Sequence, residues 1–252
     1  RIRATDDAHY CYLNLFPNYA PGETLKTDSY REYVNRFDRE VPLQLLSFDH
    51  YPVVGDTCRP EWYENLEIFS DEARKAGKPF WAFALATAHK PYPIPDLAQL
   101  RLQVYSDLAY GAQGIQYFTY WTPEKNPTWD FHHAPVERSS GRRTDVYDKI
   151  KQMNAEIQAL SGVFLGCEVV SVRHTGESIP RGTVRLTELP AGVKKLETTG
   201  AGAVVSELRN GDNRFVVIVN RDFKNPMTLQ IELDETACLL YTSPSPRDRS
   251  VS

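Results

Sequence analysis

The feature that most constrains the fold is an alternation of strand-like and helix-like segments that repeats about every 35 residues. Apolar, strand-like segments are centred near Leu13, Leu46, Phe83 and Tyr117, and an amphipathic segment follows each of them. Strands and helices that alternate at this spacing form a parallel sheet with right-handed crossovers. The first two thirds of the chain are therefore expected to be an α/β structure.

The expected strands cover residues 9–15, 43–48, 79–85 and 114–120, and the expected helices cover 29–40, 60–76, 96–110 and 144–160. Eight such βα units fill about 250 residues in a (β/α)8 TIM barrel, so these four units correspond to half of one. An open, doubly wound sheet is the alternative. No glycine-rich phosphate loop follows any of the expected strands, which favours the barrel.

The pattern changes after the fourth unit to short strands with turns between them. These strands are expected at 167–173, 203–209, 214–220 and 227–233, and Asn210-Gly-Asp-Asn213 is a strong hairpin signal. Such strands predict a small antiparallel β-sandwich. The expected domains are a partial barrel at 1–162 and a β-sandwich at 163–238. The Ser/Pro-rich segment 239–252 is interpreted as a non-native, adapter-like or disordered tail.

Charge and cysteine spacing exclude several classes of function. The formal net charge is −4, which gives no basic surface for nucleic acid, and no apolar run approaches the ~20 residues of a membrane span. Cys11, Cys58, Cys167 and Cys238 show no CxxC spacing, so free thiols are expected rather than a zinc site. The pair His132-His133 has no third ligand nearby, and neither a metal nor a cofactor is expected.

Polar and aromatic residues gather just after the expected strands, where barrel enzymes place their sites. Asp49 is the candidate catalytic residue. The candidate substrate-binding residues, in chain order, are Asn14, Asn18, His50, Tyr51, His89, Tyr120 and Trp121. A cleft that combines carboxylate, amide, imidazole and aromatic groups suits a neutral polyhydroxylated ligand. The expected partner is therefore a carbohydrate.

Five segments carry a resemblance to a known family, and they are 14–19, 47–52, 78–83, 109–121 and 215–220. They resemble glycoside hydrolase-like proteins, common in gut Bacteroidetes, that are related to the β-galactosidase and cellulase barrels. The resemblance covers residues 6–233. It implies that the four strands are strands five to eight of the barrel, with strands one to four upstream, and it implies a periplasmic or extracellular location. The oligomeric state stays open.

The same resemblance implies a mechanism with two carboxylates, an acid/base after strand four and a nucleophile after strand seven. The strand-seven position falls near residues 84–87, which read Ala-Leu-Ala-Thr and contain no Glu. Asp49, at the end of the sixth strand, is the best remaining carboxylate. It can act as base or nucleophile, bind a sugar hydroxyl, or serve a structural role by capping a turn or pairing with an Arg.

The other candidates also have structural alternatives. Trp121 is interpreted as a sugar-stacking platform, with core packing as the alternative, and Tyr51 as a cleft wall. His50 and Asp49 are adjacent, so only one of the two is expected to face the barrel axis, and structural hydrogen bonding explains His50 equally well. His89 either replaces the missing Glu in space or is a solvated loop histidine.

Three functions follow from these observations. The first is a glycoside hydrolase that cleaves O-glycosidic bonds in a glycan, of which this chain is a fragment that is expected to be inactive alone. The second is a non-catalytic carbohydrate-binding barrel. The third is a barrel lyase or isomerase, which a metal or phosphate requirement would favour.

Overall fold

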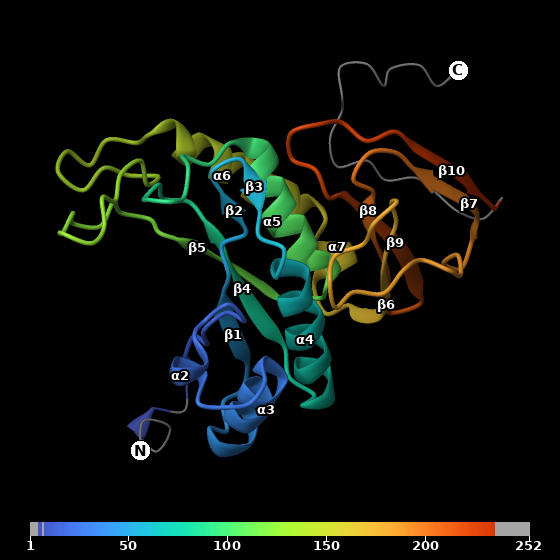
Figure 1. Ribbon diagram of the computed structural model, residues 1–252, viewed down its shortest axis with the longest axis horizontal. Coiled ribbons are helices and arrows are strands. Elements are labelled where there is room, and N and C mark those ends of the chain that lie inside the picture. Colours follow the sequence, from blue (N-terminus) through green and yellow to red (C-terminus); the bar gives the residue numbers. More distant parts are fainter. Residues whose placement is uncertain (1–4, 7, 235–252) are drawn as a thin grey trace.

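The computed structural model describes residues 5, 6 and 8–234 and has a mixed α/β part followed by antiparallel strands (Figure 1). Strands β1 (Leu46–Asp49), β4 (Phe80–Leu85) and β5 (Gly114–Phe118) form a parallel sheet in the order β1-β4-β5. Leu15 adds a single parallel bridge to Phe48 of β1. The α/β class with a parallel sheet, predicted from the strand–helix alternation, is confirmed.

Four long helices alternate with these strands and lie within two residues of their predicted bounds. They are α3 (Tyr30–Glu40), α4 (Trp62–Lys75), α5 (Leu97–Ala109) and α6 (Asp145–Ala159), and the short helices are α2 (Gly22–Leu25) and α7 (Ser161–Phe164). Helix α5 starts with a capping box. The Asp96 carboxylate accepts a hydrogen bond from the Gln99 backbone N–H at 2.7 Å, and the Gln99 side chain accepts one from the Asp96 N–H at 3.1 Å.

Replacing Asp96 with alanine is expected to lower the free energy of unfolding by about 1 kcal/mol, because a backbone N–H at the start of α5 loses its acceptor. Asp96→Asn keeps an acceptor oxygen in the same place and should retain most of the stability. Urea denaturation of the two variants measures the difference. Equal stability of the alanine and asparagine variants would show that the cap contributes nothing.

The strand predicted at residues 9–15 is wrong except at its last residue. Only Leu15 pairs with the sheet, through its N–H to the Ser47 carbonyl at 2.8 Å, and residues 9–14 form no strand. Tyr10 is 67% exposed and Leu13 is 52% exposed. The apolar alternation of this segment predicted a buried strand, but Tyr10 and Tyr12 instead rest on the Trp81 ring and remain exposed.

The two faces of the parallel sheet differ in chemistry. Phe48 is 1% exposed and its ring lies 4.5 Å from that of Phe69 on α4, so this side of β1 packs on the helices. Successive side chains on a strand point to opposite faces. Ser47 and Asp49 therefore lie on the other side of the sheet. Together with Asn14, Trp81 and Gln116 they define what is called here the inner face.

The antiparallel strands form separate sheets. β6 (Glu168–His174), β8 (Ala203–Asn210) and β9 (Asn213–Asn220) make a three-stranded sheet, β7 (Val193–Thr198) pairs with β10 (Leu229–Leu233), and β2 (Val53–Val54) pairs with β3 (Thr57–Cys58). The predicted hairpin at 210–213 is confirmed, with Asn210 paired to Asn213 and Gly211 at φ +60°. β7 was missed because its sequence, VKKLET, is rich in charge.

Helix α5 stands between the parallel sheet and the three-stranded antiparallel sheet (Figure 1). The Ser206 hydroxyl of β8 donates to the Ala109 carbonyl at the end of α5 at 2.6 Å. A side chain at Gly111 would place its Cβ 2.6 Å from the Val169 side chain, so the approach of β6 to this turn requires glycine. The apolar core runs without interruption from the α/β part into the antiparallel part.

Several sequence predictions fall partly or wholly outside the described residues. The tail at 239–252 and Cys238 lie outside them, whereas Cys11, Cys58 and Cys167 are free thiols. Within the described part of the chain, none of the helices combines the length and apolar character that a membrane span requires.

Candidate active site

A chain of hydrogen bonds connects four side chains of the inner face. The Asn14 amide donates to Asp49 Oδ1 at 2.6 Å, and the Ser47 hydroxyl donates to Asn14 Oδ1 at 2.9 Å. The Gln116 amide of β5 donates to Ser47 Oγ at 3.2 Å. Asp49 is the last residue of β1 and the sole acidic residue in the three parallel strands. The predicted candidates Asn14 and Asp49 are therefore in contact at a strand end.

The surroundings of Asp49 set the charge of its carboxyl group. Partial burial raises the pKa of Asp49, and the Asn14 amide, its own backbone N–H and the Tyr51 hydroxyl act in the opposite direction. None of the ion pairs among the described residues involves Asp49. A half-buried carboxyl with a raised pKa and no cationic partner is suited to accept and return a proton.

Tyr51 and His89 belong to a wall of aromatic rings beside Asp49. The Tyr51 ring lies 6.0 Å from Phe118 and 5.8 Å from Tyr92, and the His89 ring lies 4.8 Å from Tyr92. Phe131 is 4.7 Å from His89 on another side. Tyr51 is 8% exposed and His89 is 5% exposed, so the interpretation of His89 as a solvated loop histidine is wrong. These buried rings therefore pack against one another and form a wall of the site.

His89 has a defined hydrogen-bonding role. Its Nδ1 lies 3.0 Å from the Thr87 carbonyl oxygen, which can only accept, so Nδ1 carries the proton of the neutral ring and donates it there. Burial lowers the pKa of His89. The neutral imidazole is held in one orientation by the backbone. In this orientation the His89 Nε2 carries no proton and keeps its lone pair.

Asn18 and His50 lie away from the inner face. The Asn18 amide donates to the Glu61 carbonyl at 2.9 Å, and its backbone N–H donates to Asn65 of α4 at 2.8 Å. His50 is 1% exposed, and its ring meets that of Tyr19 edge-on at 4.9 Å. Asn18 is thus bonded to the start of the α4 unit, and His50 is buried against Tyr19. The structure does not bring them together with Asp49, because residue 50 points to the face opposite residue 49.

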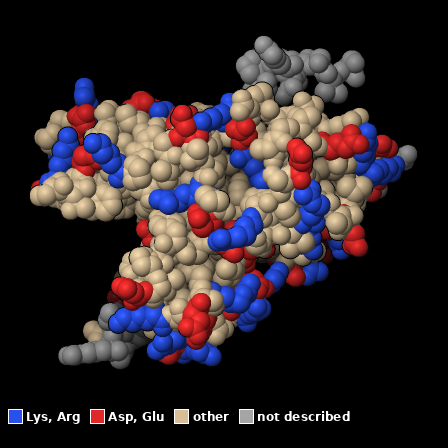
Figure 2. Space-filling view, viewed as in Figure 1, with Lys and Arg blue, Asp and Glu red and all other residues tan. Residues whose placement is uncertain are grey.

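Tyr120 and Trp121 occupy the loop after β5. Tyr120 is 56% exposed, Trp121 is 48% exposed, and their rings meet edge-on at 5.6 Å. The Trp121 ring is therefore not part of the core. Figure 2 shows a hollow between the lobe that carries this loop and the lobe that carries α2 and α3. Trp121 is thus available for a ligand, although the structure records no contact between it and Asp49.

Residues 84–87, at the end of β4, contain no carboxylate and are buried. Ala84, Leu85 and Ala86 are 0–4% exposed, and Thr87 is fully buried. The Thr87 hydroxyl accepts a hydrogen bond from the Thr119 backbone N–H at 2.9 Å. The polar group at this position is occupied by the neighbouring strand end, so it is not free to act on a ligand.

Sequence reasoning missed Ser47 and Gln116 as members of the site. Ser47 was detectable, because it lies two residues before Asp49 and so shares its face of the strand. Gln116 required the register, in which Asp49 pairs with Phe83 and Phe83 with Gln116. Tyr92 was also missed, because it reaches Tyr51 and His89 from a loop.

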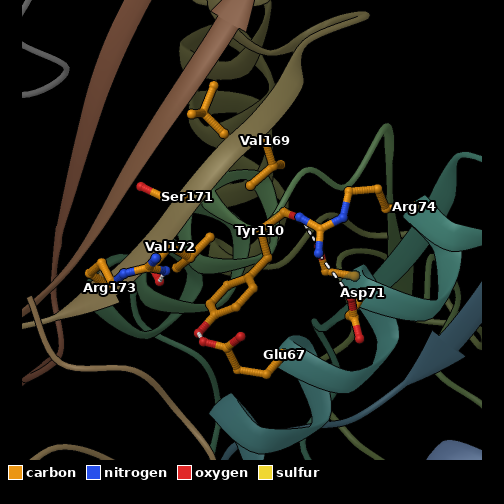
Figure 3. A pocket seen from close by; sticks show the side chains of 10 residues that line it. Glu67, Asp71, Arg74, Tyr110, Val169, Ser171, Val172 and Arg173 are labelled. Carbon is orange, nitrogen blue, oxygen red and sulfur yellow. Dashed lines mark hydrogen bonds and ion pairs between the residues drawn. The ribbon is translucent and has the colours of Figure 1, made fainter. Parts of the chain in front are cut away.

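A separate cavity of about 200 Å³ lies between α4 and β6, on the helix side of the parallel sheet. Figure 3 shows the Tyr110 hydroxyl donating to Glu67, and Arg74 paired with Asp71. The Tyr110 hydroxyl oxygen also lies 2.8 Å from Nε2 of the buried His174. Glu67 accepts from Tyr110, Asp71 pairs with Arg74, and Arg173 donates to the Val172 carbonyl, so the charged groups of this cavity serve the packing of α4 against β6.

Buried His50 and His174 make stability depend on pH. Burial lowers the pKa of each from 6.5 to about 3, so the unfolded chain binds a proton first on acidification. Their contribution is complete above pH 6.5 and declines toward pH 3. Each histidine is expected to remove up to about 1.4 kcal/mol of unfolding free energy per pH unit in that window.

Urea denaturation at pH 7 and pH 5, compared between the wild type and His174→Gln, isolates this effect. Glutamine keeps a donor toward Tyr110 but does not titrate, so the variant should lose less stability than the wild type on acidification. The comparison with the variant is needed because burial raises the pKa of Asp107. A carboxyl whose pKa is raised on folding makes the protein more stable on acidification, which is opposite to the effect of the histidines. Equal losses in both proteins would contradict the assignment.

No group of three His, Cys, Asp or Glu side chains in the described ranges is placed to hold a metal ion. His132 and His133 contact each other edge-on at 5.1 Å. The site consists of a carboxylate, two amides, a hydroxyl and aromatic rings.

A parallel β/α sheet with a carboxylate, amides and aromatic rings at its strand ends is an arrangement that glycoside hydrolases use. The chain belongs to glycoside hydrolase family 42, whose model carries the description beta-galactosidase and matches residues 14–160. The matched segment contains Asn14, Asp49 and Trp121. The glycoside hydrolase character that the resemblance implied is confirmed at the level of the family.

Two solved structures are similar to the chain at low identity. The beta-galactosidase from the psychrophilic Marinomonas ef1 is 16% identical over 59% of this chain, with a TM-score of 0.41, and the chain spans 23% of its length. The endo-beta-1,4-mannanase from Thermotoga petrophila is 12% identical over 86% of this chain and 57% of its own, with a TM-score of 0.36. No curated protein sequence matches the chain.

Proposed function

We propose that the protein hydrolyses O-glycosidic bonds, with β-galactosides as the first substrate class to test. The observation that carries the proposal is the position of Asp49, at the end of β1 within the segment that matches family 42. Its half-buried carboxyl is hydrogen bonded to Asn14 and borders the Tyr51 ring. Carboxylates beside aromatic rings are the groups that glycosidases use on sugars.

In this proposal the parallel sheet is the C-terminal half of a (β/α)8 barrel, with Leu15, β1, β4 and β5 as strands five to eight. The order of these segments in the sheet equals their order in the chain, as a barrel requires. Strand four of the upstream half would then pair beside Leu15, which bridges to β1. The proposed domain at 163–238, of which the structure describes 163–234, is then a β-sandwich.

Asp49 acts in this proposal as the general acid/base or nucleophile, and the partner carboxylate comes from the upstream half. A pKa raised by burial suits proton transfer near neutral pH. Tyr51 and His89 shape the wall of the sugar site, and Tyr120 and Trp121 offer exposed rings to a sugar face. Asn18 and His50 support the site from behind. A periplasmic or extracellular location fits a glycan substrate.

The test is a panel of 4-nitrophenyl glycosides and polysaccharides, assayed with the chain as given and with the chain joined to its upstream coding sequence. Release of nitrophenolate from the β-galactoside, ahead of the β-glucoside and β-mannoside, supports the proposal. A longer protein that folds and cleaves none of the panel contradicts hydrolysis.

A carbohydrate-binding protein without catalysis is the second candidate. The observation that favours it is the sequence at residues 84–87, which carries no carboxylate at the end of β4. Such a protein would bind galactose or a galactoside in calorimetry and release no product over many hours. Turnover that depends on Asp49 would eliminate this alternative.

A further inference from the structure

The hydrogen-bond chain of the inner face crosses three strand segments and runs in one direction. It begins at the Gln116 amide on β5, passes through the Ser47 hydroxyl on β1 and the Asn14 amide before Leu15, and ends at Asp49. Ser47 is fully buried, so water does not compete for its hydroxyl. Every link is 2.6–3.2 Å long, within the range of ordinary hydrogen bonds.

The donors and acceptors of this chain leave one consistent arrangement. The Asp49 carboxylate can only accept, so Asn14 must turn its NH2 group toward it. Asn14 Oδ1 then faces Ser47 and can only accept, so the Ser47 hydroxyl proton points to Asn14. The remaining lone pair of Ser47 Oγ receives the Gln116 NH2 group. Each member of the chain fixes the orientation of the next.

The charge of Asp49 depends on these neutral donors. The ionisable side chains that influence its surroundings are tyrosines, namely Tyr19, Tyr30, Tyr33 and Tyr51, and each is uncharged at neutral pH. No lysine or arginine pairs with it in the described structure. A carboxylate without a cation is stabilised by the hydrogen bonds it accepts, and Asn14 supplies the first of these, beside the Asp49 backbone N–H and the Tyr51 hydroxyl.

We propose that Ser47 and Gln116 are positioning residues, which act through Asn14 to hold the Asp49 carboxylate ionised and in one orientation. The relevance of this chain to catalysis rests on the proposed function, but the chain itself does not. Asn14, expected from the sequence to bind substrate, becomes the link between the buried hydroxyl and the carboxylate. Without the Ser47 hydroxyl, Asn14 Oδ1 loses its donor, and the amide is no longer held in place from the side opposite Asp49.

The experiment is a pH titration of the Asp49 side-chain carboxyl carbon by ¹³C NMR, in the full chain and in the Ser47→Ala variant. We expect the pKa of Asp49 to rise by about 1 in Ser47→Ala, since the ionised form loses an oriented donor. Ser70→Ala is the matched control, because Ser70 donates to the Tyr110 carbonyl on the helix side and should leave Asp49 unchanged. Ser47→Thr keeps the hydroxyl and should restore the wild-type titration.

A second variant keeps the proposal testable if Ser47→Ala does not fold. Gln116→Leu removes the first donor at a half-buried position and should raise the pKa of Asp49 by a smaller amount than Ser47→Ala. An unchanged titration in whichever folded variant is measured would overturn the proposal. This readout requires no turnover, so its failure leaves the hydrolysis proposal standing, and absence of hydrolysis leaves the hydrogen-bond chain standing.

Discussion

Asp49→Asn is expected to lower kcat/KM for an aryl β-galactoside by about 10²- to 10⁴-fold, which is the contribution typical of a general acid or base. Asparagine is close to aspartate in size, so the variant should fold as the wild type does. It cannot exchange a proton or attack a sugar carbon. Because Asp49 is the sole carboxylate on the parallel strands, no neighbour on the same strands can replace it. The measurement is initial rates on folded protein with the upstream half present.

Glu124→Gln is the matched control for this substitution. Glu124 lies in the loop after β5, its side chain is 77% exposed, and it pairs with Arg138 at 3.1 Å. An exposed ion pair of this kind contributes little to either stability or chemistry. Full activity in Glu124→Gln together with the loss in Asp49→Asn locates the reaction at β1. Activity retained in Asp49→Asn would move the catalytic carboxylate elsewhere.

Phe48→Ala is expected to lower the free energy of unfolding by about 3–5 kcal/mol, the range for removing a fully buried phenylalanine. The Phe48 ring is 1% exposed and lies between Phe69 of α4, at 4.5 Å, and Phe80 of β4, at 6.2 Å. Its removal leaves a cavity at the junction of sheet and helix. The loss should appear as a lower urea midpoint with an unchanged slope.

Phe16→Ala is the control for Phe48→Ala, because it removes the same side chain at an exposed position. Phe16 is 51% exposed, so its truncation should change the unfolding free energy by no more than about 0.5 kcal/mol. A large loss in Phe16→Ala would mean that the segment before α2 is packed against something else. A small loss in Phe48→Ala would contradict the packing of β1 on α4.

The sequence predicts the helices well and places Asp49 at a strand end, because both depend on local patterns. The apolar spacing of α3 to α6 is set by the face that each helix buries, and helix ends carry caps such as Asp96. The position of Asp49 follows from the rule that functional side chains come just after parallel strands. The divergence of Asp49 and His50 follows from the alternation of side chains along a strand.

Other parts of the site depend on contacts between distant segments. Gln116 reaches Ser47 across the sheet, and Tyr92 reaches Tyr51 from a loop, so neither contact has a local signature. Asn18 lies after Leu15 as expected, but Asn65 and Glu61 of the next unit bind it from the helix side. The alternation at residues 9–15 predicted a strand, and the burial that a strand requires is missing there.

The central claim is that the inner face at the end of β1 binds carbohydrate, and chemical-shift mapping with methyl β-D-galactopyranoside tests it most directly. The account predicts that the amide signals of Asp49 and Tyr51 and the indole signal of Trp121 shift in a saturable way. Signals of the β8–β9 hairpin should stay unchanged. Saturable shifts confined to the antiparallel strands, or no shifts at millimolar sugar in a folded sample, would contradict the claim.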